Sequence, residues 1–388
     1  MELMIGLFSD VFPPIMDGVS LTVKNYADNI YTKGKEVTVV TPFAPGEHVR
    51  VPYPIYYYTS IPVPMRKPYR FGMPGSKIMS LLKHIPFEIV HTHAPFSSGH
   101  LAMQIAHKQN IPLVATFHSK FKQDFERAIP FTPFVDFAVN YVINFFEQAD
   151  AVWVPQASVE PVLREYGYKG EVSVVENGND FVSPKEEVEY LRDKTRAELG
   201  LKEGEMMFLF VGQHIWEKNI GFVLDALAKI KDYPFKFFTI GKGYAEAQIR
   251  QKIIEYGLED RVTLLGSVFD RNILKGYYAA ADLFLFPSLY DNAPLVVREA
   301  AAMHTSAVML EGSTAAEVIQ DQYNGFLSKN DNDAFAQLLI YLINHPQEVQ
   351  RVGERASVTL TRSWDDIVTE VLERYKDIEA KYKKEKGL

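Results

Sequence analysis

Short apolar runs alternate with helix-like segments through the first half of the chain. The runs are MIGLF (4–8), VTVVT (37–41), IVHTH (89–93), LVAT (113–116), AVWVP (151–155) and VSVVEN (172–177). Such β-rich runs, separated by helical patterns, are typical of a parallel sheet covered by helices on both faces. Gly34 follows a helical stretch at 20–33, where a glycine ends a helix. The first half therefore predicts a doubly wound α/β domain.

The second half repeats this pattern. Strand-like apolar runs lie at 207–212, 235–241, 262–266, 283–287 and 307–310. Helical segments follow the first four of these runs, at 220–231, 244–256, 271–280 and 295–303. We predict an N-terminal domain of residues 1–182 and a C-terminal domain of residues 183–363. A helix over about 364–388 either packs on the second domain or crosses back onto the first. Two doubly wound domains place ligands outside the carboxyl ends of their strands, in a cleft.

Composition narrows the class of protein. The 388 residues include 47% hydrophobic and 23% charged residues, which is globular, and no cysteine, which excludes disulfides and thiolate-bound zinc. The N-terminal apolar run is too short for a signal peptide, and no stretch of eighteen apolar residues predicts a membrane span. We therefore expect a soluble, cytoplasmic protein. The net charge of -8 argues against nucleic-acid binding.

The stretch PSLYDNAPLVVREAAAM (287–303) has the clearest chemical pattern. A strand ends near Pro287 and a helix is expected to begin near Pro294. The backbone N–H groups and the positive helix end there suit an anion such as a diphosphate. Asp291 and Glu299 flank this helix end and suit the hydroxyls of a sugar and a ribose. The alternative is that Asp291 caps the helix and Glu299 lies on the surface.

Three further loops follow predicted strands. Lys218 stands near a helix start, where the helix dipole disfavours a cation unless an anion lies between them; the alternative is an exposed lysine. His118 follows the strand at 113–116 and either faces the cleft or is a structural histidine. Gly18 permits close approach of a ligand, but no GxGxxG motif is present, so a nicotinamide cofactor is not expected.

Two motifs that look like metal sites are interpreted otherwise. Asp331-Asn332-Asp333 lies in a polar turn before AFAQLL, and we predict a helix cap there. In HTHAPFSSGH, His91 and His93 alternate on a strand, and His100 begins a helix. Without a converging carboxylate, a zinc site is not expected.

The order and spacing of these loops resemble glycosyltransferase family 4, a large family of retaining enzymes with the GT-B fold. The matching segments are PPIMDG, ATFHS, VENGND, VGQHIWEKN, IGKG, VTLLGSV and the 287–303 stretch. The resemblance implies two Rossmann-like domains and transfer of a hexose or N-acetylhexosamine from a nucleoside diphosphate sugar, with a UDP-sugar favoured, to an acceptor hydroxyl. It also implies retention of configuration, with neither a cofactor nor a metal ion.

The resemblance also assigns residues. His118, Lys218 and Asp291 become the catalytic candidates, and Glu299 is expected to hold the ribose. The expected donor-binding set is Asp17, Gly18, Gly212, Gln213, Lys218, Ser267, Val268, Asp291, Asn292, Ala293, Pro294, Leu295, Val296 and Glu299. Gln213 stands where the family has an arginine and Asp17 where it has a glycine. Loss of one charge-assisted phosphate contact weakens binding by roughly 1.5–3 kcal/mol unless another cation replaces it.

The acceptor is left open by the sequence. The aromatic stretch 131–146 predicts either an apolar acceptor groove or membrane-facing surface, or a buried core helix. A basic run includes Arg66, Lys67, Arg70, Lys77 and Lys83, and suits either an anionic membrane or a solvated loop. We expect a membrane glycolipid or lipid-linked acceptor, with peripheral contact on the inner face of the membrane. The alternatives are a soluble saccharide or small-molecule acceptor, or a nucleotide-sugar epimerase of the same fold.

Overall fold

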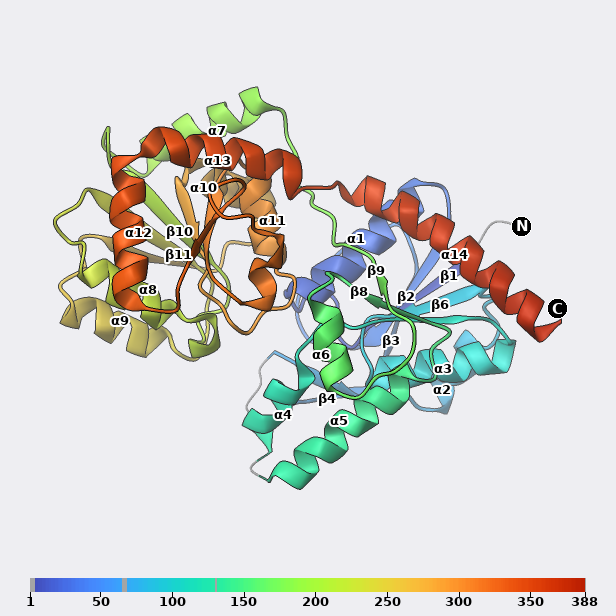
Figure 1. Ribbon diagram of the computed structural model, residues 1–388. Helices are drawn as coiled ribbons and strands as arrows, with labels where there is room; N and C mark the ends of the chain where they lie inside the picture. Colours follow the sequence, from blue (N-terminus) through green and yellow to red (C-terminus); the bar gives the residue numbers. More distant parts are fainter. Residues whose placement is uncertain (1–3, 65–67, 130, 388) are drawn as a thin grey trace. The chain divides into compact units, whose positions relative to one another are not determined.

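The computed structural model describes residues 4–64, 68–129 and 131–387, and divides the chain into two compact units (Figure 1). The N-terminal unit comprises residues 1–178 together with 364–388, and the C-terminal unit comprises residues 179–363. The chain therefore crosses between the units twice. Each unit is built around its own parallel sheet.

In the described part of the N-terminal unit, seven parallel strands lie in the order β3-β2-β1-β6-β7-β8-β9. Their bounds are β1 Met4–Phe8, β2 Glu36–Pro42, β3 Ile55–Tyr58, β6 Ile89–Thr92, β7 Leu113–Thr116, β8 Ala151–Val154 and β9 Ser173–Val174. A small antiparallel pair, β4 (Ser60–Pro62) and β5 (Arg70–Gly72), is separate from this sheet. The strand order reverses between β1 and β6. Ligands bind beyond the carboxyl ends of the strands at such a switch point.

Helices connect these strands. They are α1 Gly18–Thr32, α2 Ser76–Leu82, α3 Ser97–Gln109, α4 Phe121–Ala128, α5 Thr132–Phe146, α6 Val159–Glu165 and, from the far end of the sequence, α14 Trp364–Lys386. α1 begins where the Asp17 carboxylate accepts the backbone N–H of Ser20 at 2.8 Å. It stops before Gly34, whose φ of 71° is left-handed, as the sequence predicts.

The C-terminal unit repeats the topology. Among its described residues, six parallel strands lie in the order β12-β11-β10-β13-β14-β15, so the switch point falls between β10 and β13. The strands are β10 Met206–Val211, β11 Phe235–Ile240, β12 Val262–Gly266, β13 Leu283–Leu285, β14 Ser306–Leu310 and β15 Phe326–Ser328. The helices are α7 Lys185–Glu198, η1 Trp216–Lys218, α8 Ile220–Ala228, α9 Glu246–Glu255, α10 Arg271–Ala280, α11 Leu295–Ala302, η2 Thr314–Val318, α12 Asn332–Asn344 and α13 Pro346–Thr359.

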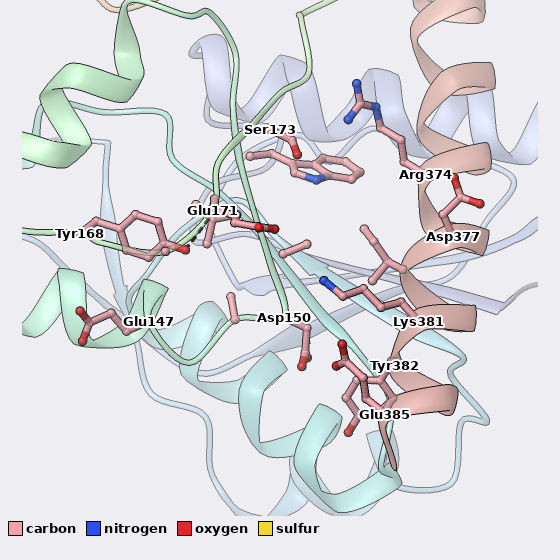
Figure 2. A pocket seen from close by; sticks show the side chains of 16 residues that line it. Glu147, Asp150, Tyr168, Glu171, Ser173, Arg374, Asp377, Lys381, Tyr382 and Glu385 are labelled. Atoms are coloured by element: carbon pink, nitrogen blue, oxygen red, sulfur yellow. Dashed lines mark hydrogen bonds between the residues drawn. The ribbon is translucent and has the colours of Figure 1, made fainter. Parts of the chain in front are cut away.

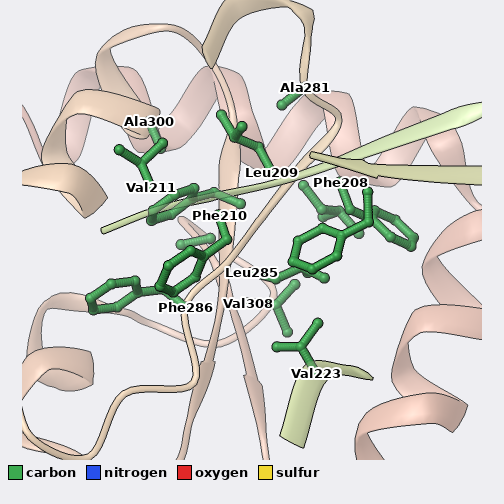
Figure 3. Close-up of a cluster of buried hydrophobic side chains, with 14 of the residues drawn as sticks. Phe208, Leu209, Phe210, Val211, Val223, Ala281, Leu285, Phe286, Ala300 and Val308 are labelled. Carbon is green, nitrogen blue, oxygen red and sulfur yellow. The ribbon is translucent and has the colours of Figure 1, made fainter. Parts of the chain in front are cut away.

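The core of this unit explains why its strands are continuous apolar runs rather than alternating ones. Every residue of β10 is buried, because helices cover both faces of the sheet. Phe208 and Phe210 are fully buried beside Phe286 and Leu285 (Figure 3). Burial of one such side chain stabilises the fold by roughly 1.5–3 kcal/mol.

Helix α14 packs on the N-terminal unit, the second of the two placements left open by the sequence. The Trp364 ring lies 5.8 Å from that of Tyr26 on α1, and Lys33 pairs with Asp365 at 2.6 Å. Tyr375, fully buried, reaches His91 in the centre of the sheet. No helix in the described ranges is both long and apolar enough to cross a membrane.

The predicted doubly wound architecture is confirmed in both halves. Helix α10 begins and ends at the predicted residues, and most other elements agree within a few residues. The strands β3 and β15 and the hairpin of β4 and β5 were not predicted. β3 is an edge strand, and its IYYY run is half-buried without a clear alternation. The stretch 172–177 forms only the two-residue strand β9.

Candidate active site

Lys218 and Asp291 meet at the switch point of the C-terminal unit. Lys218 ends η1 in the loop after β10, and Asp291 lies in the loop after β13. Their side chains form a salt bridge with 13% and 16% of their surfaces exposed. The Lys218 ammonium also lies 5.7 Å from the ring centres of both Phe286 and Tyr290, within reach of a cation–π interaction. The alternative of an exposed surface lysine is therefore wrong.

The anion beside Lys218 in this structure is a protein carboxylate. The conflict between the lysine and the helix start is relieved by Asp291. The loop that carries Asp291 is shaped by the Ser288 hydroxyl, which accepts the backbone N–H groups of Tyr290 and Asp291 at 3.2 and 3.4 Å. Pro294 occupies the N-cap of α11, as predicted, and Asn292 is buried. That Lys218 binds a diphosphate and Asp291 a sugar remains a prediction.

Glu299 lies within α11 and is 5% exposed, so the alternative of a surface glutamate is wrong. Its Oε1 accepts from Arg271 at 2.8 Å, and its Oε2 accepts from the Tyr278 hydroxyl at 2.9 Å. Burial and the Glu299 carboxylate raise the pKa of Tyr278, so this hydroxyl remains a donor. A carboxylate has about four acceptor positions, so Glu299 can still accept hydrogen bonds from a diol.

Arg271 was not singled out by the sequence analysis. It begins α10 and also holds Asp180, at 2.6 and 3.1 Å. Burial acts to lower the pKa of Arg271, but the carboxylates of Glu299 and Asp180 raise it. A cation at a helix start is unfavourable without a neighbouring anion. Arg271, like Lys218, is a cation at a helix start, and this sequence feature could have identified it as a candidate.

Glycines allow the loops after β10, β11 and β12 to pack backbone against backbone. A Cβ on Gly241, whose φ is 139°, would lie 1.9 Å from the carbonyl oxygen of Gly212. The N–H of Gly212 donates to Ile240 and that of Gly241 to Gly266, at 2.9 and 2.8 Å. This packing fixes the backbone that leads to Gln213, which is exposed.

The base-binding candidates follow the same row of strand ends. Ser267 is exposed and Val268 is half-buried, directly after Gly266. Val268 packs on the hydrophobic core of this unit. Their contact with a nucleobase remains a prediction.

In the N-terminal unit, the loop after β1 carries the glycine turn. Asp17 caps α1, and its burial raises its pKa against the opposing hydrogen bond from Ser20. A Cβ on Gly18 would meet no atom within 4 Å. Asp10, which the sequence analysis did not single out, lies at this switch point and accepts from Ser97 Oγ at 2.5 Å and Ser98 N at 2.9 Å.

His118 is not a lone histidine. It follows β7, and its Nε2 lies 3.0 Å from Nδ1 of His93, with the two rings stacked at 5.3 Å. The His91 ring lies 4.1 Å from that of His93, and its nitrogens contact Thr116 Oγ1 at 2.7 Å and the Tyr375 hydroxyl at 2.6 Å. We call His91, His93 and His118 the histidine column.

The histidine column is uncharged at neutral pH. Burial lowers the pKa of His118 to about 4. Burial lowers the pKa of both His91 and His93 well below the usual value, and neighbouring histidines add to this effect. The histidine column therefore offers hydrogen-bonding groups without net charge at the carboxyl edge of the N-terminal sheet.

The motifs resembling metal sites have other roles. Asp331 caps α12 by accepting the N–H of Ala334 at 2.8 Å, as predicted. His93 pairs with His118 and not with His100. Within the described ranges, no three histidine or carboxylate side chains converge as a metal site would require.

A pocket of about 500 Å³ lies elsewhere in the N-terminal unit. Figure 2 shows Arg374 and Lys381 on α14 on one side, and Asp150 and Glu171 on the other. Asp150 directly precedes β8, so the pocket is at the amino end of this strand. The histidine column lies at the opposite, carboxyl edge, where ligands of doubly wound sheets bind.

Helix α5 buries one side, and its outward side carries aromatic residues together with the exposed Asp136, Asn140 and Asn144. Three aromatic side chains face outward: Phe134 is 62% exposed, Phe137 71% and Tyr141 44%. The buried face includes Val135, Val139, Val142 and Phe146. The alternative that 131–146 is a fully buried core helix is therefore wrong, because one side of α5 is exposed.

The basic run is only partly described. Arg66 and Lys67 lie outside the described residues. Arg70 donates to the side chain and carbonyl of Ser60 at 2.6 and 2.9 Å. Lys77 and Lys83 are exposed.

Comparison with known proteins agrees with this architecture. The family model for Glycosyltransferase Family 4 matches residues 16–181, and that for Glycosyl transferases group 1 matches residues 192–358. Alpha-monoglucosyldiacylglycerol synthase of Streptococcus pneumoniae is 27% identical over 350 residues, which is 88% of this chain and 79% of that protein. The synthase of the same name from Acholeplasma laidlawii is 25% identical over 380 residues, 92% of each chain.

Solved structures share the fold. Sucrose-phosphate synthase from Thermosynechococcus elongatus has a TM-score of 0.80 at 20% identity, covering 98% of this chain and 100% of that one. Anabaena HepE in complex with UDP and glucose has a TM-score of 0.77 at 18% identity, covering 97% and 100%. With two doubly wound units and family matches in both, the chain is a glycosyltransferase of the family 4 type with the GT-B fold.

Proposed function

We propose that the enzyme transfers a hexose, with retention, from a UDP-sugar to a lipid-linked acceptor at an anionic membrane surface. Two relatives that span most of this chain are named as alpha-monoglucosyldiacylglycerol synthases, which supports a glycolipid product. A structural neighbour was solved with UDP-glucose, which supports a UDP-sugar donor. UDP-glucose carries its sugar as the α anomer, so an α-linked product is the outcome that retention requires.

The outward face of α5 is the observation on which the lipid acceptor rests. Phe134, Phe137 and Tyr141 recur at helical spacing and lie exposed over a helix whose other face is already buried. An exposed aromatic patch of this kind marks an interaction site, and a tyrosine at its end suits the interface between acyl chains and water. The exposed Lys77 and Lys83 add attraction to anionic lipids, each cation near the surface contributing about 1 kcal/mol.

In the proposed reaction the residues of the C-terminal unit bind the donor. The Lys218 ammonium and the N-terminus of α11 stabilise the charge that develops on the departing diphosphate. These groups take the place of a metal ion. Glu299 accepts hydrogen bonds from the ribose, and Arg271 holds its carboxylate in position.

The proposed chemistry takes place on one face of the sugar. The acceptor oxygen forms a bond to the anomeric carbon, the bond from that carbon to the phosphate oxygen breaks, and the acceptor proton passes to the departing diphosphate. No protein nucleophile takes part. Neutral His118 positions the sugar by hydrogen bonding rather than attacking it.

The test supplies UDP-glucose with vesicles that contain diacylglycerol or monoglucosyldiacylglycerol, with and without phosphatidylglycerol. We expect an α-linked glycolipid, formed faster with the anionic lipid and unaffected by a chelator. Product on soluble saccharides alone would replace the lipid acceptor, and a changed nucleotide sugar without acceptor would indicate an epimerase. A β-linked product would overturn retention.

A further inference from the structure

The partner of His118 is held from several sides. His93 is 3% exposed and lies just beyond β6, where its backbone N–H donates to Phe8 at 2.9 Å. Its ring packs at a tilt against that of His91, 4.1 Å between ring centres, and His91 is held in turn by Thr116 and Tyr375. The His93 imidazole therefore has a fixed orientation. His118 follows a different strand; its ring stacks on that of His93, and its Nε2 lies 3.0 Å from Nδ1 of His93.

This contact requires one donor and one acceptor. A neutral imidazole carries one proton, so the pair has two arrangements. In the first, His93 donates from Nδ1, and its Nε2 is a bare lone pair. In the second, His118 donates from Nε2, and the proton of His93 moves to its own Nε2.

The surroundings of His93 Nε2 distinguish the two arrangements. This nitrogen is buried and has no hydrogen-bond partner in the described structure. A buried N–H without an acceptor is rarer in folded proteins than a buried acceptor without a donor. The first arrangement leaves no buried N–H unpaired on His93.

We propose that His93 is a positioning residue that donates its Nδ1–H to Nε2 of His118, and so holds His118 in the tautomer protonated at Nδ1. Free histidine prefers the opposite tautomer, so the proposal is distinct from what His118 would adopt by itself. The ring of His118 is then held in one orientation and with one pattern of donor and acceptor. What this does for transfer rests on the proposed function, in which His118 positions the sugar.

The direct test is nuclear magnetic resonance of the full-length protein labelled with ¹⁵N-histidine. Long-range ¹⁵N–¹H correlations identify the protonated nitrogen of each neutral ring, and the His118→Asn spectrum assigns the signals of His118. We expect the proton of His118 on Nδ1. A proton on Nε2 in the wild-type protein overturns the proposal, whatever the transfer activity.

Two amide substitutions separate positioning from packing. The side-chain NH₂ of asparagine takes nearly the place of the histidine Nδ1, whereas that of glutamine takes the place of Nε2. We expect His93→Asn to retain the tautomer of His118 and transfer within about threefold of wild type. We expect His93→Gln and His93→Phe to shift His118 toward the Nε2–H form and to lower kcat by about 10²-fold, the effect of a small misplacement of a reacting group.

The outcomes for the tautomer and for the reaction can be told apart. Circular dichroism and the thermal midpoint identify any variant that fails to fold, and the wild-type spectrum does not depend on these variants. Equal losses in His93→Asn and His93→Gln would contradict the positioning role. If His118 is protonated on Nδ1 but His118→Asn transfers sugar normally, the role of His118 in the proposed function fails and the action of His93 on its tautomer stands.

Discussion

The two units of this enzyme pair the polar side chains near their switch points in opposite ways. In the C-terminal unit charges pair with charges: Lys218 with Asp291, and Arg271 with Glu299 and Asp180. In the N-terminal unit the histidine column is neutral and its rings bond to one another and to hydroxyl groups. Lys218 and Asp291 in one unit, and His93 and His118 in the other, follow the carboxyl ends of strands in a doubly wound sheet.

This difference teaches that one topology supports two kinds of recognition. Lysine and arginine paired with carboxylates can exchange those partners for another anion, so the second unit is suited to the diphosphate of the proposed donor. Neutral imidazoles offer directional hydrogen bonds without attracting a counter-ion, so the first unit is suited to hydroxyl groups. Four experiments separate these properties.

Removing Glu299 should have the largest effect. Glu299→Ala leaves the buried Tyr278 hydroxyl without its acceptor and removes one of the two carboxylates of Arg271. Truncating one member of a buried charged pair costs about 2–5 kcal/mol, so we expect UDP to bind about 30- to 5,000-fold more weakly. Isothermal titration calorimetry measures this.

Asp180→Ala is the matched control, because it removes the more exposed carboxylate of the same arginine. We expect it to change the dissociation constant of UDP less than tenfold, since exposed pairs contribute only about 0–1 kcal/mol. An effect as large as that of Glu299→Ala would mean that both variants act only by releasing Arg271.

Replacing Lys218 tests the charge at the other pair. We expect Lys218→Met to lower kcat by about 10²–10³-fold, the usual effect of removing a group that stabilises developing charge.

Gln213→Arg is the opposite change. It should tighten UDP binding about tenfold, because it places at this position the arginine that the family uses to bind phosphate. Steady-state kinetics and calorimetry measure the two effects; normal turnover in Lys218→Met would remove this residue from catalysis.

The histidine column should make stability depend on pH. The pKa of His118 is about 4 in the folded protein, below the ordinary value near 6.5, so between these values the unfolded chain binds more protons. The free energy of unfolding should therefore fall as the pH falls from 6.5 towards 4, with His118 contributing up to about 1.4 kcal/mol per pH unit. Urea unfolding across this range measures the slope.

His118→Asn should reduce that slope by the contribution of one group. A parallel pH dependence in the variant and the wild type would show that the pKa of His118 is the same in the folded and the unfolded protein. It would also remove the contrast between the two switch points.

Helix α5 provides the smallest effect and a further contrast between the units. We expect Phe137→Ser to weaken binding to anionic vesicles about tenfold while changing stability little, because 71% of the side chain is exposed. Tyr190→Ser, at a residue 65% exposed in the C-terminal unit, is the control and should bind vesicles normally. Vesicle sedimentation measures both, and equal losses would contradict a membrane-facing α5.

Features of the fold that depend on neighbouring residues along the chain, such as buried strands and helix ends, could be predicted from the sequence. Strands buried on both faces, such as β10, are continuous apolar runs, and the end of α1 at Gly34 and the cap of α12 at Asp331 follow from local backbone chemistry. β15 was missed because its three residues, FLS, stand between Gly325 and Lys329, whereas the equally short β13 lies in the longer apolar run LFLF.

The pairings of the site could not be predicted because they are tertiary. His93 and His118 are 25 residues apart and meet only because β6 and β7 are neighbours in the sheet. The same holds for Arg271 and Glu299, on α10 and α11. The sequence found Glu299 and Lys218 as candidates, and the structure adds the groups that hold them.

Helix α14 also sets an order of events during synthesis. The N-terminal sheet needs Tyr375 to complete the contacts of buried His91, yet residues 179–363 are translated between the two parts of this unit. At about 5–20 residues per second this takes roughly 10 to 40 s. Until then Tyr26 and Trp153 lack the ring contacts that Trp364 and Tyr375 of α14 make with them in the folded protein. The C-terminal unit therefore leaves the ribosome before the N-terminal unit, which begins ahead of it in sequence, can be completed.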